Sequence, residues 1–211
     1  MSEAQKTGSI LNSFRVLDLT DARGFLCGKI LGDLGADVIK MEPPRGDPSR
    51  KIGPFYQDIP DLEKSLYWWA YNTSKRGITL NLESVDGQVI FKRLVKSADI
   101  VIESFPPGYM DKLGLGYPSL SEVNPGLVMT SITPFGQTGP YMDFKGPDLV
   151  VWSLGGQTYV TGDEDKPPCR PSFPQACLNG GSQAAGATLA ALYYRELSGE
   201  GHYIDVSIQD A

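Results

Sequence analysis

The chain has 211 residues, 41% of them hydrophobic, which is enough to bury the core of one full-sized domain. Its net charge of −6 argues against a general nucleic-acid binder, and no apolar run is long enough to span a membrane. Residues 1–13 lack the apolar centre of a signal peptide, and three cysteines without metal-type spacing make a reducing cytoplasm the expected location.

The predicted elements begin with a βαβ unit. Residues 15–20 form a short apolar strand, residues 25–34 form a helix that ends at Gly35, and residues 37–42 form a second buried strand. The crossover between these strands is expected to be right-handed. Residues 43–60 are rich in Pro, Gly, Asp and Arg and are therefore predicted to form a long loop, a kind of segment that often carries function.

The rest of the chain continues to alternate strands with helices. Further strands are predicted at residues 78–82, 99–103, 127–132 and 203–208, and further helices at 85–97, 117–123, 148–158 (with a break at Gly155 and Gly156) and 183–192. In the helix over 85–97, the residues expected to point inward are Val89, Ile90, Leu94 and Val95. This alternation predicts an α/β fold with an open, Rossmann-like, mostly parallel sheet flanked by helices, and ligands beyond the carboxyl ends of the strands.

A series of short motifs runs along the chain in a fixed order. They are LGDLGADVIKME (31–42), GDPSR (46–50), NTSKRGITLNL (72–82), ADIVIESFPPG (98–108), LGLGY (113–117), NP (124–125), FGQTGPY (135–141), TG with PP (161–168) and DVS with DA (205–211). Each motif is weak by itself. In this order and spacing, from Arg15 to Ala211, the set resembles the family III CoA-transferases, the group of the formyl-CoA:oxalate and crotonobetainyl/carnitine CoA-transferases.

The resemblance implies how the chain is organised and what it works with. Residues 1–14 are expected to be a polar leader, and residues 15–211 the N-terminal part of the family's large domain, with the linker, small domain and C-terminal return absent. Coenzyme A or acyl-CoA is the implied substrate, together with a carboxylic acid and without a metal. Family members form interlocked dimers, so the implied partner is a second copy or a paralogous subunit, and neither nucleic acid nor membrane.

Coenzyme A carries a 3′-phosphate and a pyrophosphate, so its site needs basic side chains beside an apolar slot. The basic candidates in the sequence are Arg76, Lys112 and Lys145, although surface lysines are more often simply solvated. A basic residue that the family places after Glu42 is Pro43 here, and Arg45 lies two positions further on. By the resemblance, the CoA-contacting positions, expected to converge on one cleft, are Leu80, Asn81, Ser104, Phe105, Lys112, Leu113 and Lys145.

The catalytic position of the family holds an unexpected residue. The resemblance places a nucleophilic aspartate just before the helix predicted at 183–192, and Cys177 occupies that position here. A thiolate would form a plain thioester instead of the mixed anhydride that a carboxylate forms, and transfer from it to a carboxylate is uphill. The other interpretation of Cys177 is a small buried cysteine. Asp148 stands where the family often has an acidic residue near the acyl site, and is expected to be a polar pocket residue.

Three hypotheses about function stay open. The first is a CoA-transferase that moves CoA between an acyl-CoA thioester and a carboxylic acid, inactive by itself if the missing aspartate is essential. The second is a non-catalytic subunit of the same fold, paired with a catalytic paralogue that supplies the aspartate. The third, less favoured, is an acyl-CoA racemase, which needs an acid/base pair at the α-carbon of the acyl group.

Overall fold

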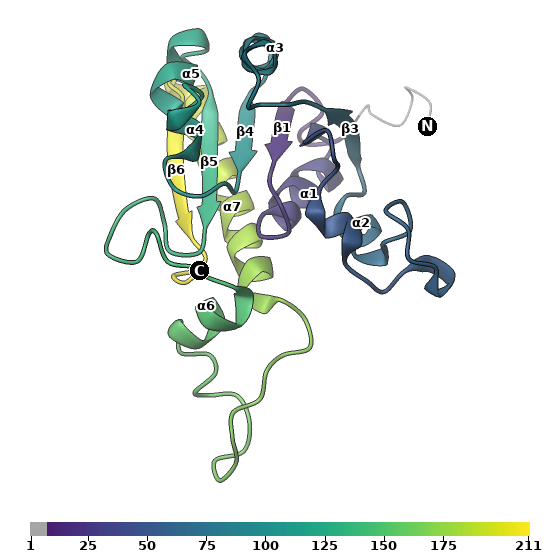
Figure 1. Ribbon diagram of the computed structural model, residues 1–211. Coiled ribbons are helices and arrows are strands. Elements are labelled where there is room, and N and C mark those ends of the chain that lie inside the picture. The colour runs from purple at the N-terminus through teal and green to yellow at the C-terminus, as the bar shows by residue number, and fades with distance from the viewer. Residues whose placement is uncertain (1–7) are drawn as a thin grey trace.

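A computed structural model describes residues 8–211, and the remainder of the predicted leader, residues 1–7, lies outside the described residues. The described strands form one fully parallel sheet in the order β3-β2-β1-β4-β5-β6 (Figure 1). They are β1 (Arg15–Leu19), β2 (Asp37–Glu42), β3 (Lys75–Thr79), β4 (Ile100–Glu103), β5 (Val128–Thr133) and β6 (His202–Ser207). The predicted open parallel α/β sheet is confirmed. Its order reverses between β1 and β4, which is where such sheets bind ligands.

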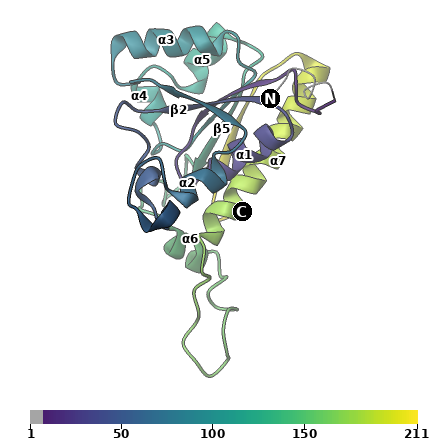
Figure 2. The ribbon, with the colours of Figure 1, turned by 90° about the vertical axis from the view of Figure 1, so that its right-hand side faces the viewer.

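Helices cover both faces of this sheet. In Figure 2, α1 and α7 lie on one side of the strands, and α3, α4 and α5 lie on the other. The helices are α1 (Phe25–Asp33), α2 (Leu66–Tyr71), α3 (Val85–Val95), α4 (Tyr109–Lys112), α5 (Tyr117–Val123), α6 (Asp148–Leu154) and α7 (Gln175–Ser198), with short 3-10 helices at Pro48–Lys51 and Tyr56–Asp58. The segment between α6 and α7 extends away from the rest of the domain in both views.

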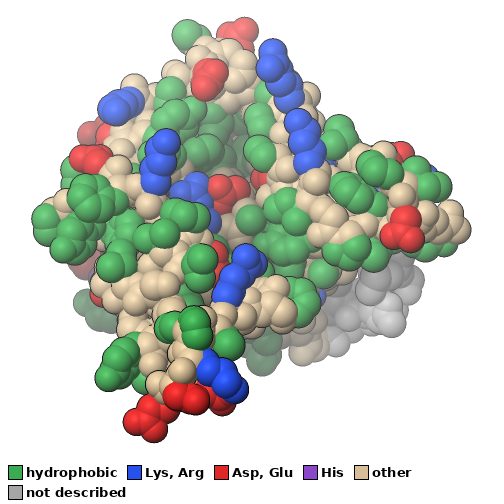
Figure 3. Space-filling model, turned by 60° about the horizontal axis from the view of Figure 1, so that its bottom comes forward, with side chains coloured by type: hydrophobic (Ala, Val, Ile, Leu, Met, Phe, Trp, Pro, Cys, Tyr) green, Lys and Arg blue, Asp and Glu red, His purple; other side chains and the backbone are tan. Residues whose placement is uncertain are grey.

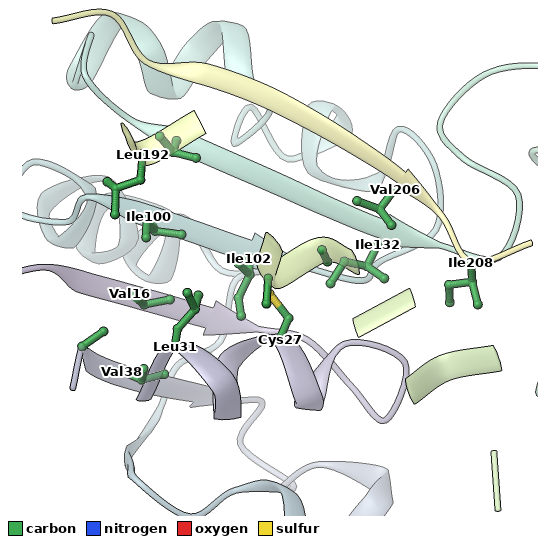
Figure 4. Packing of buried hydrophobic residues seen from close by; sticks show 14 of the residues in the cluster. Val16, Cys27, Leu31, Val38, Ile100, Ile102, Ile132, Leu192, Val206 and Ile208 are labelled. Atoms are coloured by element: carbon green, nitrogen blue, oxygen red, sulfur yellow. The ribbon is translucent and has the colours of Figure 1, made fainter. Parts of the chain in front are cut away.

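Each strand sends alternate side chains to opposite faces, so two hydrophobic clusters form. In β4, Ile100 and Ile102 face the cluster under α1 and α7, whereas Val101 faces the cluster under α3 and α5. Figure 4 shows the first cluster, in which Cys27 and Leu31 of α1 pack on the strands. Strands β2, β1, β4 and β5 are buried on both faces, which explains why they read as mostly apolar runs, whereas the edge strands β3 and β6 are more exposed.

Two predicted details of the α3 side of the domain are wrong. Val95 is buried and Leu94 packs on the core as predicted, but Val89 and Ile90 are 53% and 43% exposed. The other buried residues of α3 are Gly87 and Phe91, which form a series spaced by four with Val95. The helix is thus rotated so that the aromatic ring of Phe91 fills the space over the sheet. The strand predicted at 78–82 is β3, three residues earlier, because its register pairs with β2 from residue 75 to residue 79.

Helix α7 begins well before the predicted residue 183, because a glycine pair lies within it and does not precede it. A Cβ atom built on Gly180 would stand 2.9 Å from Ile208 Cγ1, and one built on Gly181 would stand 3.1 Å from Leu26 Cβ. Glycine costs helix propensity, but here it permits α7 to approach α1 closely, and this packing outweighs the cost.

At the other end of the chain, Leu11 of the predicted leader is buried in the core.

A buried ion network joins the first three strands. Lys75 Nζ donates to Asp18 Oδ2 at 2.8 Å, and Lys40 Nζ lies 3.6 Å from Asp18 Oδ1. Lys40 also donates to the Thr20 carbonyl, and Lys75 to the Phe25 carbonyl at 3.1 Å. Burial alone would raise the pKa of Asp18, but the two lysines hold that pKa below its ordinary value. The network therefore fixes the loop that follows β1.

Replacing Asp18 by alanine would leave the buried Lys75 without a carboxylate partner and Lys40 with only the more distant Asp47, at 3.9 Å. We expect Asp18→Ala to lower the free energy of unfolding by about 3–5 kcal/mol, measured by urea denaturation followed by circular dichroism. The control is Asp163→Ala, which removes an ion pair with Lys166 whose side chains are both mostly exposed, and should leave the unfolding midpoint nearly unchanged. Equal effects of the two substitutions would contradict a structural role for the network.

Candidate active site

A cleft of about 800 Å³ opens at the carboxyl ends of the central strands. Its walls come from the loops that follow β1, β2, β3 and β4, at the point where the strand order reverses. Figure 3 views this end of the sheet, and basic and acidic side chains meet there inside a hollow bordered by apolar ones. The position is the one where an open α/β sheet is expected to bind a ligand.

The structure brings together half of the positions predicted to contact coenzyme A. Four of them line the cleft: Leu80 and Asn81 after β3, and Ser104 and Phe105 after β4. Tyr109, which the sequence prediction did not include, lines it as well. The phenylalanine and tyrosine rings lie 4.8 Å apart and form one apolar wall.

The other predicted positions stay outside this cleft. Arg76 forms an ion pair of 2.7 Å with Asp37, the first residue of β2. The parallel register places Arg76 opposite Ile39, two residues from Asp37, so the side chain lies near the amino end of β2. Leu113 packs against the hydrophobic cluster under α3 and α5. Lys112, at the end of α4, and Lys145, in the loop before α6, are exposed. Their contact with coenzyme A therefore stays a prediction.

The loop after β2 is held as a wall of the cleft. Arg50 donates to both carboxylate oxygens of Glu42, at 2.7 and 2.8 Å, and the Asp47 N–H donates to Glu42 at 2.9 Å. The Arg50 guanidinium lies 4.1 Å from the centre of the Trp68 ring, which packs it against α2. Arg45, in the same loop and two positions beyond Pro43, lines the cleft and is exposed.

The loop after β1 places a carboxylate and a guanidinium side by side in the cleft. Arg23 donates to both carboxylate oxygens of Asp21, from Nε at 2.9 Å and from Nη2 at 2.7 Å. The Ser104 hydroxyl donates to Asp21 Oδ1 at 2.9 Å and accepts the Asp21 N–H at 2.8 Å. The loops after β1 and β4 are thereby locked to each other, and the guanidinium has a fixed orientation.

Cys177 lies in the first turn of α7, not in a loop ahead of the helix as predicted. Its backbone N–H donates to Asp148 Oδ1 at 2.9 Å, so Asp148 at the start of α6 satisfies one free donor of the helix N-terminus. Burial, and then the charge and hydrogen bond of Asp148, raise the pKa of the Cys177 thiol far above its ordinary value. The thiol is therefore neutral and a poor nucleophile at physiological pH.

Two further ionisable groups at this end of the sheet were not predicted. Burial raises the pKa of Tyr67 in α2, and the charges of Asp21 and Asp148 act in the same direction. Burial also raises the pKa of Glu103 to about 7, although the Phe105 N–H donates to its carboxylate at 2.6 Å. The cluster around position 177 is thus rich in acids and contains one cation, Arg23, among the groups that act on the thiol.

Some of these residues carried a usable signal in the sequence. Asp21, Arg23 and Glu103 stand at or just beyond the ends of predicted parallel strands, where site residues of such sheets gather. Tyr67 carried none, because the six-residue helix α2 is too short to show a periodic pattern.

Residues 8–211 contain neither a candidate metal site nor a candidate membrane-spanning helix. Within residues 8–211, no group of three or more His, Cys, Asp or Glu side chains is arranged to hold a metal ion. Over the same range, none of the helices has both the length and the apolar character needed to cross a membrane.

Substitution of Asp148 by asparagine tests the electrostatic account of Cys177. Asp148→Asn keeps an oxygen that accepts the Cys177 N–H but removes the charge that raises the thiol pKa. We expect alkylation of Cys177 by iodoacetamide to become several-fold faster near the ordinary thiol pKa of about 8.5. Peptide mass spectrometry gives the rate at each cysteine, with the exposed Cys169 as the internal reference. An unchanged rate would show that Asp148 does not control the thiol.

Comparison with known proteins identifies the family. Residues 11–211 match CoA-transferase family III. The chain is 39% identical over 204 residues to the succinyl-CoA:(R)-benzylsuccinate CoA-transferase subunit BbsE of Thauera aromatica, covering 97% of this chain and 50% of that protein. It is 40% identical over 204 residues to the succinate–glutarate CoA-transferase of Agrobacterium fabrum, covering 95% and 51%.

A solved structure shares the fold. The crystal structure of a CAIB/BAIF family protein from Brucella suis aligns with a TM-score of 0.89 and 37% identity, over 96% of this chain and 54% of that one. The chain spans about half the length of the curated relatives it matches. The sequence match over residues 11–211, supported by this shared fold, shows that the chain belongs to CoA-transferase family III.

Proposed function

We propose that this chain is part of a CoA-transferase that moves CoA between an acyl-CoA thioester and a carboxylic acid. The observation that supports the proposal is the cleft at the carboxyl ends of β1 and β4, lined by four of the positions that the family resemblance assigns to coenzyme A. The apolar wall of Phe105 and Tyr109 suits the uncharged part of the ligand, and Arg45 suits a phosphate. Family membership supports the same ligand.

Truncation of the apolar wall tests this assignment. We expect Phe105→Ala to weaken the binding of coenzyme A roughly tenfold, measured by isothermal titration calorimetry on the full-length protein with its partner chains. The control is Phe173→Ala, which truncates an exposed ring in the segment between α6 and α7. An affinity that falls equally in both variants, or in neither, would refute the placement of coenzyme A in this cleft.

We further propose that this chain does not supply the nucleophile. In the family reaction, a carboxylate attacks the thioester carbonyl and releases CoA thiolate, which leaves a mixed anhydride. CoA thiolate then attacks the anhydride, forms an enzyme thioester and releases the first acid, and the incoming carboxylate goes through the same steps in reverse order. Cys177 cannot form the anhydride, and its half-buried thiol is a weak nucleophile because burial and the charge of Asp148 raise its pKa. The aspartate then comes from a partner chain.

Exposed apolar side chains support a partner. Tyr193 and Leu197, four residues apart and therefore on the same side of α7, are 68% and 71% exposed. Exposed apolar side chains grouped on a face are typical of surfaces that another chain covers. We propose a second copy or a paralogous subunit as that partner and the cytoplasm as the location, with no metal required.

The substitution Cys177→Ala tests whether Cys177 acts as a nucleophile or takes no part in catalysis. In the assembled protein we expect CoA transfer to continue at a nearly unchanged rate, because the thiol takes no part in the covalent steps. A nucleophilic cysteine would instead lose several orders of magnitude in rate. Treatment with hydroxylamine in the presence of acyl-CoA gives an independent readout by mass spectrometry. An aspartyl adduct on the partner chain is expected, and an adduct on Cys177 would rule out the silent role.

A further inference from the structure

Arg23 is a fixed cation in the cleft with one side of its guanidinium unused. Its Nε and Nη2 atoms donate to Asp21, while Nη1 makes no hydrogen bond within residues 8–211. The side chain is 28% exposed and lines the cleft. Because Asp21 is itself held by Ser104, the orientation of the guanidinium is set before any ligand arrives. An arginine fixed in this way is suited to bind a planar anion through its free edge.

Arg23 lies at the same end of the sheet as Cys177, the reacting position of the family. Helix α7 contacts α1 at Gly181, where a Cβ atom would stand 3.1 Å from Leu26 Cβ. Cys177 is one helical turn before Gly181, and Arg23 is just before the start of α1, so the two approach each other at the same end of the sheet. Arg23 also acts on the thiol electrostatically. An anion on Arg23 would therefore lie toward position 177, whereas Arg45, which also lines the cleft, is exposed.

We propose that Arg23 binds the free carboxylate of a dicarboxylic acid, the carboxylate that does not exchange with CoA. This inference rests on the proposed function, because it names the class of acid that the same site accepts. The reacting carboxylate loses its charge when it becomes a thioester, so a guanidinium bound to it would stabilise the reactant and slow the reaction. The carboxylate that does not exchange with CoA keeps its charge throughout the reaction. Its contact with Arg23 therefore strengthens substrate binding without slowing the reaction. Arg23 is therefore a specificity-determining residue.

Three ligands and one substitution test the proposal. Binding of succinate, butyrate and coenzyme A is measured by calorimetry on the full-length protein with its partner chains. Butyrate has the four-carbon chain of succinate but only one carboxylate. We expect succinate to bind more tightly than butyrate, and Arg23→Met to weaken succinate roughly tenfold while butyrate and coenzyme A are unaffected. Arg23→Lys, which keeps the charge but loses the planar fork, should restore part of the preference.

Other outcomes each overturn the assignment. Equal losses for succinate and butyrate would mean that Arg23 holds the reacting carboxylate, and a loss confined to coenzyme A would mean that it holds a phosphate. An unchanged preference for succinate in Arg23→Met would exclude any role. The control is Arg93→Met, which replaces an arginine on the exposed side of α3, and thermal unfolding checks that both variants are folded. Failure of the unchanged protein to bind coenzyme A would refute the proposed function instead.

Discussion

The buried contact between Asp18, Lys40 and Lys75 is the constraint on which the rest of the site depends. It joins the carboxyl-terminal half of β1 to β2 and β3, and it holds the carbonyls of Thr20 and Phe25 at the two ends of the loop after β1. Such a network costs desolvation energy, which only close pairing and full hydrogen bonding offset. In return it fixes one geometry for a loop that would otherwise have many conformations.

That fixed loop organises the cleft around it. It positions Asp21, which binds Ser104 in the loop after β4 and orients Arg23. On the opposite side, the ion pair between Glu42 and Arg50 holds the loop after β2 against the aromatic ring of Trp68. Both walls are therefore built from charges that pair locally, Asp21 with Arg23 inside the loop after β1 and Glu42 at the end of β2 with Arg50 in the loop that follows it. This explains how a chain of net negative charge offers cationic groups at one place without a basic surface.

Position 177 differs from its surroundings because its electrostatics oppose ionisation. A helix N-terminus usually lowers the pKa of a cysteine, since the free backbone N–H groups favour a negative charge. Here burial raises the pKa of the Cys177 thiol. The Asp148 carboxylate, which accepts the Cys177 N–H at the N-terminus of the helix, raises that pKa further. Burial and the neighbouring Asp148 thus make a thiol at position 177 a poor nucleophile. The chemistry at this position thus follows from the residue that the chain carries and from the acid beside it.

The sequence by itself determined the parallel α/β sheet and the end of the sheet where the site lies. Strands 15–20, 37–42, 99–103 and 127–132 each coincide closely with a strand of the structure, because runs of buried apolar residues separated by helices leave few other arrangements. The motif resemblance also identified Leu80, Asn81, Ser104 and Phe105, which meet in the cleft because all of them follow neighbouring parallel strands.

Only the tertiary structure decided the partners of the individual side chains. The start of α7 depended on Gly180 and Gly181 packing against Ile208 and Leu26, a contact between distant segments that propensity does not encode. The register of β3 against β2 places Arg76 beside Asp37 and outside the cleft, so the cations that line the cleft come from other loops. Local patterns set which elements form, whereas contacts across the sheet set which charges meet, because those contacts join residues far apart in the chain.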